Sequence, residues 1–545
     1  MRKGIVPLGA ALCAVLYVFS SISYAQTAPP KLTPAQWQAD VRFLGEELPK
    51  RHRNAFHRVK KEEFDATLKA VYDAVPSMTE DEIIVGLMKI VAKVRDGHTS
   101  VFARPYFRSG VYPIGFYSFS DGLYIRKAAP NYSDMLGGKV VRIGKLTADD
   151  ALAKLGQISS ADNEMGVESL APRLMSVPEV LAGLKIVDDK QKLDIVIEKD
   201  GKHRSFIVTP TGTFENLLHD LPDARDVAAA TGESPLYSRD RGSFYWYEFL
   251  KAKKLLYVKH NEIANKDDEP VAAFYKRVFD FVDANPVDKF VLDLRNNGGG
   301  NNTLNVPVVV GLIKSKINKR GKLFVITGRE TFSAAQNLVN QLEKYTEAIF
   351  VGEPTAGHPN HYGDNRPFTL PNSGLTVRAS TLWWQDLDPR DDRQWTAPEI
   401  AAELSFSDYK NGKDPALQAV VDYVPGSTLS ELIQNASTQQ ALGDFTARYR
   451  VVKADPKSKY VNSEAAMNRF GYTLLGAKRV ADAIEIFKLN VDTYPKSANV
   501  YDSLGDAYEA AGQKEEAIKS FERALSIDPS YPSSLAAVQR LKPKQ

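Results

Sequence analysis

Two short apolar runs, each followed by residues that free the backbone, constrain the fold of this chain more than any other feature. The first run is 290–294 and leads into Arg-Asn-Asn-Gly-Gly-Gly at 295–300. The second is 323–327 and leads into Gly-Arg-Glu-Thr-Phe-Ser at 328–333. Apolar runs of this length bounded by glycine favour buried strands. We therefore expect a loop at the end of each strand, where active sites commonly lie.

A serine in the second loop and glycines in the first suggest acyl transfer. Ser333 is expected at a strand-to-helix turn, as an activated serine nucleophile requires. The amide of Ala334 would be one donor of an oxyanion hole, and Gly299 or Gly300 would supply the other. The alternative is structural, because residues 333–336 also have the pattern of a capping box, in which the serine merely caps a helix.

A serine hydroxyl needs a base at neutral pH, and a histidine after a helical segment is the first candidate. His98 lies in Asp-Gly-His-Thr at 96–99, just beyond a capped helical pattern. The end of that helix and Asp96 would both favour the imidazolium form. His358 and His361 are rival bases in a glycine-containing stretch further along the chain.

At 545 residues the chain is too long for a single core, so we expect several domains. The pattern is helical at first, then strand-like, and then alternates strands with helices, which favours a layered α/β core. The predicted class is therefore a multidomain α/β protein. Its expected regions are an N-terminal helical region (26–105), a β-rich module (106–212), an α/β core (240–425), a linker (426–463) and helical repeats (464–541).

The last eighty or so residues repeat with a period of 34 residues. Glycine, alanine, phenylalanine and proline recur in register, at Gly471 and Gly505, Ala483 and Ala517, Phe487 and Phe521, and Pro495 and Pro529. This pattern resembles the tetratricopeptide repeat, whose stacked helical pairs bind proteins. Two clear copies are fewer than the three usually needed for stability. Either a degenerate third copy lies near 430–463, or the pair packs on the core. We expect the repeats to bind a protein partner or to mediate self-association.

The N-terminus has the pattern of a secretory signal over residues 1–25, with two basic residues, an apolar stretch and a small-residue cleavage site. The alternative, a membrane anchor, is disfavoured because the stretch is shorter than a span of about 20 residues. We expect a periplasmic or secreted protein with no stable membrane span after signal removal. The single cysteine, Cys13, lies in the signal, so the mature chain has no thiol for disulfides, catalysis or metal binding.

Charge and motif content narrow the classes of partner. Lys plus Arg (70) nearly balances Asp plus Glu (67), and no basic cluster is interleaved with aromatic residues, so nucleic acid is not an expected partner. The sequence has no His-Glu-x-x-His or comparable ligand pattern, and no metal or other cofactor is expected.

Four motifs together resemble the tail-specific (carboxy-terminal-processing) serine peptidase family, which includes the tricorn core. They are Asp-Leu-Arg-Asn-Asn-Gly-Gly-Gly at 293–300, Thr-Phe-Ser-Ala-Ala-Gln at 331–336, Gly-Glu-Pro-Thr at 352–355 and Asp-Gly-His-Thr at 96–99. The resemblance spans about residues 35–425. It implies a crotonase-like (ClpP/crotonase) α/β core, a PDZ-like insert at the β-rich module, and cleavage of a peptide or protein substrate.

Within that family one branch uses a serine–lysine dyad, and the tricorn-like branch uses serine and histidine supported by an acid. Gly357-His358 stands where the lysine branch has glycine and lysine. The resemblance therefore implies Ser333 with His98 as base, and Asp392, six residues before Pro398, as the acid. His358 is the alternative base, in a histidine variant of the lysine branch.

One departure concerns the link between base and acid. Gly97 stands where tricorn has a serine between them, so Asp392 would reach His98 only through a water or Thr99. From a different class of function, the alternative is a catalytically inactive peptide-binding scaffold of the same fold.

Overall fold

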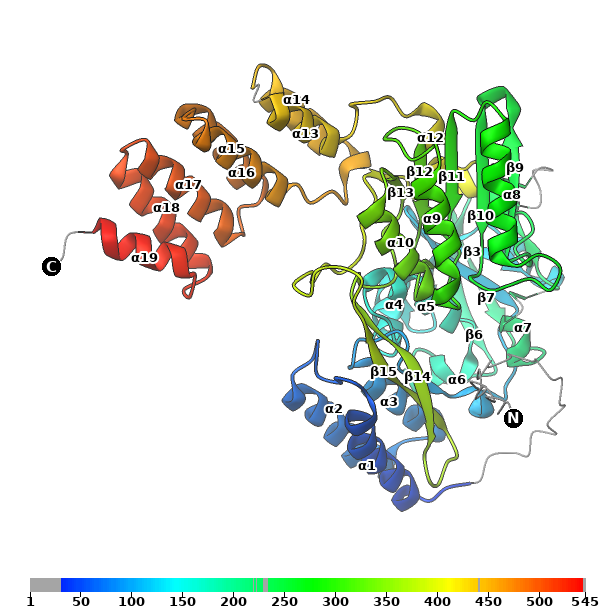
Figure 1. Cartoon of the computed structure of the whole chain (residues 1–545). Coiled ribbons are helices and arrows are strands. Elements are labelled where there is room, and N and C mark those ends of the chain that lie inside the picture. Colours follow the sequence, from blue (N-terminus) through cyan, green and yellow to red (C-terminus); the bar gives the residue numbers. More distant parts are fainter. Residues whose placement is uncertain (1–30, 219, 222, 229–233, 440–441, 543–545) are drawn as a thin grey trace, which may run out of the picture.

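The computed structural model describes residues 31–218, 220–221, 223–228, 234–439 and 442–542. The signal expected at residues 1–25 lies outside them. Figure 1 shows a body of several layers and a separate helical arm at the C-terminal end. In the described part of the chain, no helix is both long and apolar enough to cross a membrane.

Three helices form the N-terminal region: α1(Pro34–Arg51), α2(Lys61–Ala74) and α3(Glu80–Ala92). Thr33 and Thr79 begin α1 and α3 with capping boxes. The capped helical pattern that precedes His98 in the sequence is α3. The buried faces pack on one another through Leu44, Phe64 and Leu87. Because α3 ends at Ala92, the chain turns immediately into the segment that carries His98.

The β-rich module is a seven-stranded sheet with the order β2-β3-β4-β6-β7, with β5 on β4 and β8 on β3. The strands are β2(Ile114–Phe119), β3(Gly122–Ala128), β4(Lys139–Ile143), β5(Leu146–Thr147), β6(Leu193–Lys199), β7(Lys202–Val208) and β8(Arg225–Asp226). The helices α4(Ala148–Gly156), α5(Glu164–Leu174), α6(Pro178–Gly183) and α7(Phe214–Leu218) interrupt or follow them. The strand-like pattern did not indicate these helices, which are short and are begun by local caps such as Thr147 and Asn163.

The α/β core is a six-stranded sheet with the order β16-β13-β12-β11-β10-β9, parallel except for the edge strand β9. The strands are β9(Tyr245–Leu250), β10(Leu255–His260), β11(Lys289–Asp293), β12(Leu323–Thr327), β13(Ile349–Gly352) and β16(Ile400–Ala401). The helices are α8(Val271–Ala284), α9(Val306–Lys314), α10(Ala334–Tyr345), α11(Phe406–Lys410) and α12(Pro415–Asp422). Helices α8, α9 and α10 cover one face of the sheet, and α12 packs on the other (Figure 1).

Burial on both faces explains the continuous apolar runs at 290–292 in β11 and 323–326 in β12. Phe290 and Leu292 face the cluster of α8 to α10, whereas Val291 faces that of α12. The two strands pair in parallel, with Phe290 opposite Leu323. Their following loops therefore emerge side by side at one edge of the sheet, as the sequence predicted for two strand-end loops.

A long ribbon joins the core to the N-terminal region. It consists of β14(His361–Thr369) and β15(Thr376–Trp384), and β1(Ser100–Phe102) pairs with β15. Figure 1 shows the ribbon running from the core alongside α1 and α3. Because β1 begins two residues after His98, this pairing brings the histidine turn against the core.

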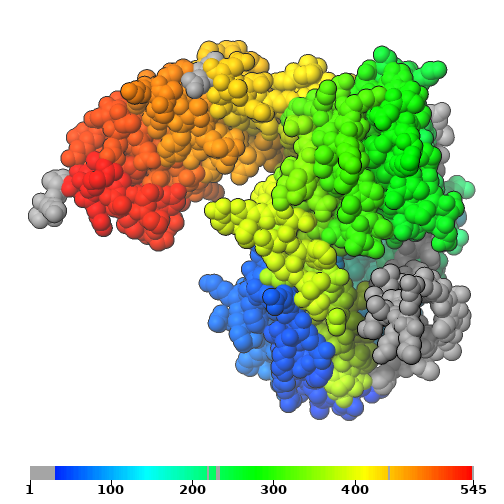
Figure 2. Space-filling view, viewed as in Figure 1, coloured from blue at the N-terminus to red at the C-terminus, as the bar shows by residue number. Residues whose placement is uncertain are grey.

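The C-terminal arm consists of α13(Leu429–Gln439), α14(Phe445–Ala454), α15(Glu464–Gly476), α16(Val480–Thr493), α17(Ala498–Ala510), α18(Lys514–Ile527) and α19(Pro532–Leu541). The 34-residue period has a packing cause, because a Cβ added at Gly471 would lie 2.5 Å from the Phe487 ring and one at Gly505 would lie 2.6 Å from the Phe521 ring. Figure 2 shows the arm curving away from the body, with open space between it and the N-terminal helices.

The stretch predicted as a linker, 426–463, instead holds the helical pair α13 and α14. Its buried residues Leu432 and Phe445 share a core with Phe470 and Phe487 of the next pair. A third helical pair thus precedes the two clear copies, in the place where a degenerate third copy was one of the two alternatives. The sequence did not show it because the pair has the apolar stripe of a helix but not the repeated glycine, phenylalanine and proline.

Candidate active site

Ser333 lies at the turn between β12 and α10, in a strained backbone conformation. Its φ of 56° and ψ of −127° belong to a region that non-glycine residues rarely adopt and that costs about 1–3 kcal/mol. Its side chain makes no capping hydrogen bond to α10. The capping-box alternative is therefore wrong, because this backbone turns the hydroxyl away from the helix amides.

The hydroxyl of Ser333 instead meets His98, 235 residues away in the sequence. The Ser333 Oγ atom and the His98 Nε2 atom are 2.9 Å apart. The His98 ring stacks on Phe332 at 4.4 Å between centroids, and its side chain is 13% exposed. A hydroxyl within hydrogen-bond distance of an imidazole can transfer its proton to it as it attacks a carbonyl.

The electrostatic surroundings of His98 combine burial with acidic neighbours. Burial lowers the pKa of His98 below its ordinary 6.5, although Asp96, Asp364 and the backbone of Tyr362 act in the opposite direction. The Asp96 Oδ1 atom lies 3.9 Å from His98 Nδ1. A lowered pKa keeps the imidazole neutral near pH 7, the state that can accept a proton.

The glycine loop packs directly against the serine. A Cβ added at Gly299 would lie 2.6 Å from Ser333 Cβ and 2.9 Å from the Ala334 nitrogen, and the φ of Gly299 is 110°. A Cβ at Gly300 would lie 2.2 Å from the Ile263 carbonyl oxygen, with φ at 138°. Only glycine fits at both positions, and the loop thereby reaches the first turn of α10.

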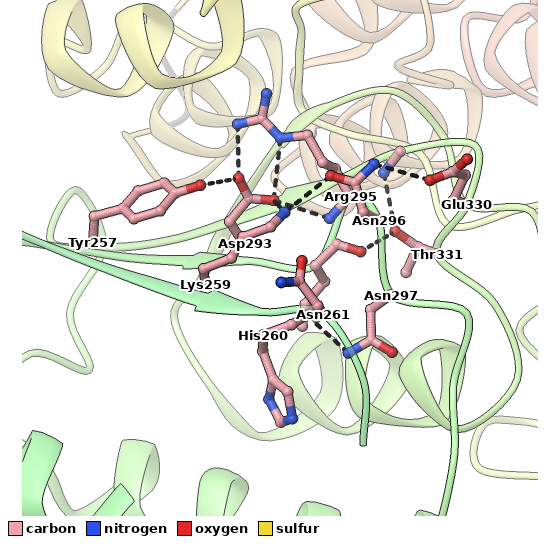
Figure 3. Close-up of polar contacts among 12 residues, drawn as sticks. Tyr257, Lys259, His260, Asn261, Asp293, Arg295, Asn296, Asn297, Glu330 and Thr331 are labelled. Carbon is pink, nitrogen blue, oxygen red and sulfur yellow. Dashed lines mark hydrogen bonds and ion pairs between the residues drawn. The ribbon is translucent and has the colours of Figure 1, made fainter. Parts of the chain in front are cut away.

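The amide of Gly299 has a partner in this structure. It donates to the Asn297 Oδ1 atom at 2.9 Å. The Asn297 side chain also donates to the His260 carbonyl oxygen at 2.9 Å (Figure 3), and the Asn297 backbone carbonyl oxygen accepts from the Phe332 amide at 3.1 Å. Asn297 therefore ties the glycine loop to Phe332, the residue that precedes Ser333.

A buried ion network holds the base of the glycine loop. Asp293 accepts from Lys259 at 3.1 Å and from the Tyr257 hydroxyl at 2.5 Å, and Arg295 lies 2.9 Å from it (Figure 3). Arg295 also pairs with Asp414 at 2.9 Å. Burial raises the pKa of Asp293, but Arg295 and Lys259 outweigh it and lower the pKa to about 2. The carboxylate is thus a structural anchor, which accounts for the aspartate and arginine of the motif.

The loop before Ser333 is fixed from other regions of the fold. Arg329 pairs with Glu353 at 2.5 Å and donates to the Ser118 carbonyl oxygen of β2 at 2.9 Å. Glu330 accepts from Asn296 at 2.9 Å and pairs with Arg173 of α5. The position of the serine therefore depends on the β-rich module as well as on the core.

Asp392 and His358, two residues singled out from the sequence, are not brought to Ser333. Asp392 is exposed, and in the described part of the chain no hydrogen bond joins it to His98. His358 is buried and its Nδ1 atom meets the Arg393 carbonyl oxygen at 3.0 Å. Both residues line a cavity of about 250 Å³ that also contacts Asp96.

Two further residues around the histidine turn were not predicted from the sequence. His52, which ends α1, has its Nε2 atom 2.8 Å from Asp96 Oδ2. Asp162 accepts from the Gly97 amide at 2.7 Å and from the His358 amide at 3.4 Å. A lone histidine or aspartate outside any motif carries no signal in a single sequence, so these contacts become visible only in the folded chain.

Comparison with known proteins gives a family match for part of the repeat region and structural neighbours for most of the chain. The tetratricopeptide repeat family matches residues 498–531. No curated protein sequence matches the chain. The structure of mature CPAF complexed with lactacystin is 15% identical, with a TM-score of 0.51, and the match covers 71% of this chain and 98% of that one.

Two further neighbours are matched over similar lengths of this chain but less closely. The photosystem II D1 C-terminal processing protease is 12% identical, with a TM-score of 0.33 and coverage of 71% and 96%. The tricorn protease is 15% identical, with a TM-score of 0.34 and coverage of 71% and 36%. The chain is thus a mixed α/β protein with the fold of CPAF, and it ends in a tetratricopeptide repeat region.

Proposed function

We propose that this chain is a serine peptidase that cleaves peptide bonds through an acyl-enzyme. The observation that carries the proposal is the 2.9 Å approach of Ser333 Oγ to His98 Nε2, made by a serine in a strained turn at the start of a helix. Such a turn exposes a nucleophile and directs helix amides at the reacting carbonyl. The CPAF fold agrees with a peptidase role.

In the proposed reaction Ser333 attacks the substrate carbonyl while its proton passes to His98. The oxyanion accepts hydrogen bonds from the Ala334 amide and from an amide of the glycine loop. The positive end of the helix dipole at the start of α10 also stabilises its charge. Gly299 and Gly300 are the candidates for that second donor; Gly299 packs directly against Ser333 but must first exchange its bond to Asn297. His98 then protonates the leaving amine, and water attacks the acyl-enzyme by the same route.

The other regions would serve delivery of the substrate. The β-rich module would be a PDZ-like insert on a crotonase-like core, as the motif resemblance implies. The repeat arm would bind a protein partner or a second copy on its concave surface.

The sequence pattern at 1–25 supports export to the periplasm or beyond. Mass spectrometry of the mature chain would test this, because the exported chain should begin at Gln26.

The test of the peptidase proposal is Ser333→Ala. Removing the nucleophile of a serine protease costs about 10⁶-fold in rate, so the variant should lose peptide hydrolysis and labelling by a serine-directed phosphonate. Circular dichroism would establish that its fold is intact. Wild-type turnover in the purified variant would contradict the proposal, and a wild-type chain that neither turns over nor labels would favour a peptide-binding scaffold.

A further inference from the structure

Beside His98 lies a buried carboxylate that is held from several directions. Asp96 is 2% exposed. Its Oδ2 atom accepts from the Thr99 hydroxyl at 2.6 Å and faces His52 Nε2 at 2.8 Å, while its Oδ1 atom accepts from the His98 amide at 2.9 Å. These bonds fix the carboxylate with one oxygen 3.9 Å from the His98 imidazole.

The hydrogen bonds of His52 define which of its nitrogens carries the proton. His52 is 4% exposed, and its Nδ1 atom accepts from the Asn54 amide at 2.9 Å. In the neutral ring the proton is therefore on Nε2, the nitrogen that faces Asp96. A neutral His52 thus donates to Asp96 and leaves the carboxylate negative.

The charge of Asp96 is consistent with this arrangement. Burial alone would raise the pKa of Asp96, but the hydrogen bond from His52 and the proximity of His98 outweigh it and lower the pKa to about 2. Asp162, on the other side of the turn, behaves differently, because burial and the charge of Asp96 raise its pKa to about 8. Near pH 7 the buried negative charge of this turn is therefore on Asp96.

Two other titratable groups face His98, both from β14. Asp364 is exposed, and its carboxylate accepts from the Trp384 indole at 2.7 Å. The His361 ring lies 6.0 Å from the His98 ring, and burial lowers its pKa to about 3, so it is neutral. Solvent screens the exposed Asp364 more than the buried Asp96. Asp96 is thus the anion best placed to act on the base.

We propose that His52 and Asp96 are the positioning residues of the base, in the place that the family resemblance gave to Asp392. His52 keeps Asp96 ionised and oriented, and Asp96 holds the His98 turn and stabilises the imidazolium formed when Ser333 gives up its proton. That proton stays on His98 Nε2, and none passes to Asp96. This inference rests on the proposed peptidase function. It extends the set of residues that support catalysis from the His98 turn to the end of α1, where His52 lies.

The experiment compares Asp96→Asn, His52→Ala and His52→Gln with Asp392→Asn, which is the control. Loss of the aspartate in a directly bonded triad costs about 10⁴-fold, and because Asp96 does not bond the imidazole directly we expect a fall in kcat of about 100-fold with little change in KM. The acid limb of the pH profile should move to lower pH, since the loss of an anion lowers the pKa of His98. Asp392→Asn should change neither quantity.

The two His52 variants separate positioning from general destabilisation. A hydrogen bond to a charged group is worth about tenfold in rate or more, so His52→Ala should lower kcat by about tenfold. His52→Gln should restore most of that loss, because the glutamine amide can donate from the place of Nε2. An equally inactive His52→Gln that folds normally would count against the donor role.

A second measurement does not depend on turnover. Proton NMR titration of His98 in the Ser333→Ala background, assigned by comparison with His98→Gln, should give a lower pKa when Asp96→Asn is added. An unmoved pKa, or a larger loss of kcat in Asp392→Asn than in Asp96→Asn, would overturn the inference while leaving the serine assignment in place. Failure of the peptidase proposal itself would appear separately, as peptide turnover that persists in the single variant Ser333→Ala.

Discussion

Replacing Gly299 with alanine should damage both catalysis and stability. The new Cβ would lie 2.6 Å from Ser333 Cβ and 2.9 Å from the Ala334 nitrogen, whereas ordinary contacts begin at 3.4 Å. Either the glycine loop or the serine turn must therefore move by most of an ångström. The φ of 110° adds strain of about 1–3 kcal/mol. Because a misplacement of about 1 Å can cost about 100-fold in rate, we expect a loss of that size in kcat.

The neighbouring Gly298→Ala variant is the matched control. A Cβ at Gly298 would meet nothing within 4 Å, so this variant adds the same methyl group to the same loop without a clash. Turnover of a fluorogenic peptide, the rate of phosphonate labelling and Tm should be measured for both. Near wild-type turnover in Gly299→Ala, or equal losses in the two variants, would refute the packing of the glycine loop against Ser333.

Other predictions follow from the same geometry. Burial lowers the pKa of His98 below 6.5, so kcat/KM should be maximal above that pKa and fall as the pH drops through it. An acid limb centred above pH 6.5 would contradict the assignment of His98 as the base. His358→Ala should leave turnover nearly unchanged, because its ring bonds to Arg393 and not to Ser333; a dead variant that labels no phosphonate would make His358 the base. A chain ending at residue 428 should keep turnover of short peptides and lose binding of a protein partner. A chain ending at 463 should instead aggregate, since Phe445 and Tyr449 would lose the helices that bury them, and light scattering would distinguish the two.

The sequence predicted those parts of the fold that depend on local pattern. The apolar runs that became β11 and β12 are buried on both faces, so their composition alone marked them as strands. The repeats were predicted because Gly471 and Gly505 each face a phenylalanine ring that excludes any side chain. In both cases the physical requirement acts on the residue itself and is therefore visible in the sequence.

The parts that were missed depend on tertiary contacts. Residues 333–336 satisfy the local pattern of a capping box, yet Ser333 adopts a φ of 56° and its hydroxyl meets His98 instead of capping the helix. The helical pair in 426–463 is stabilised by Phe470 of the following pair, which lies outside the segment itself. Asp392 was inferred by counting from Pro398, and the count takes no account of how the intervening loop folds.

The contact between Ser333 and His98 depends on residues from several separate regions of the fold. The serine turn is held by Asn297 and by Arg329, whose partners belong to the core and to the β-rich module. The histidine turn is held by Asp96 and by the pairing of β1 with β15. Neither turn contains what fixes the distance between them. The 2.9 Å contact therefore requires the N-terminal helices, the β-rich module and the core to fold together. A change in how these regions pack would alter the distance between Ser333 and His98 even if each region kept its own fold.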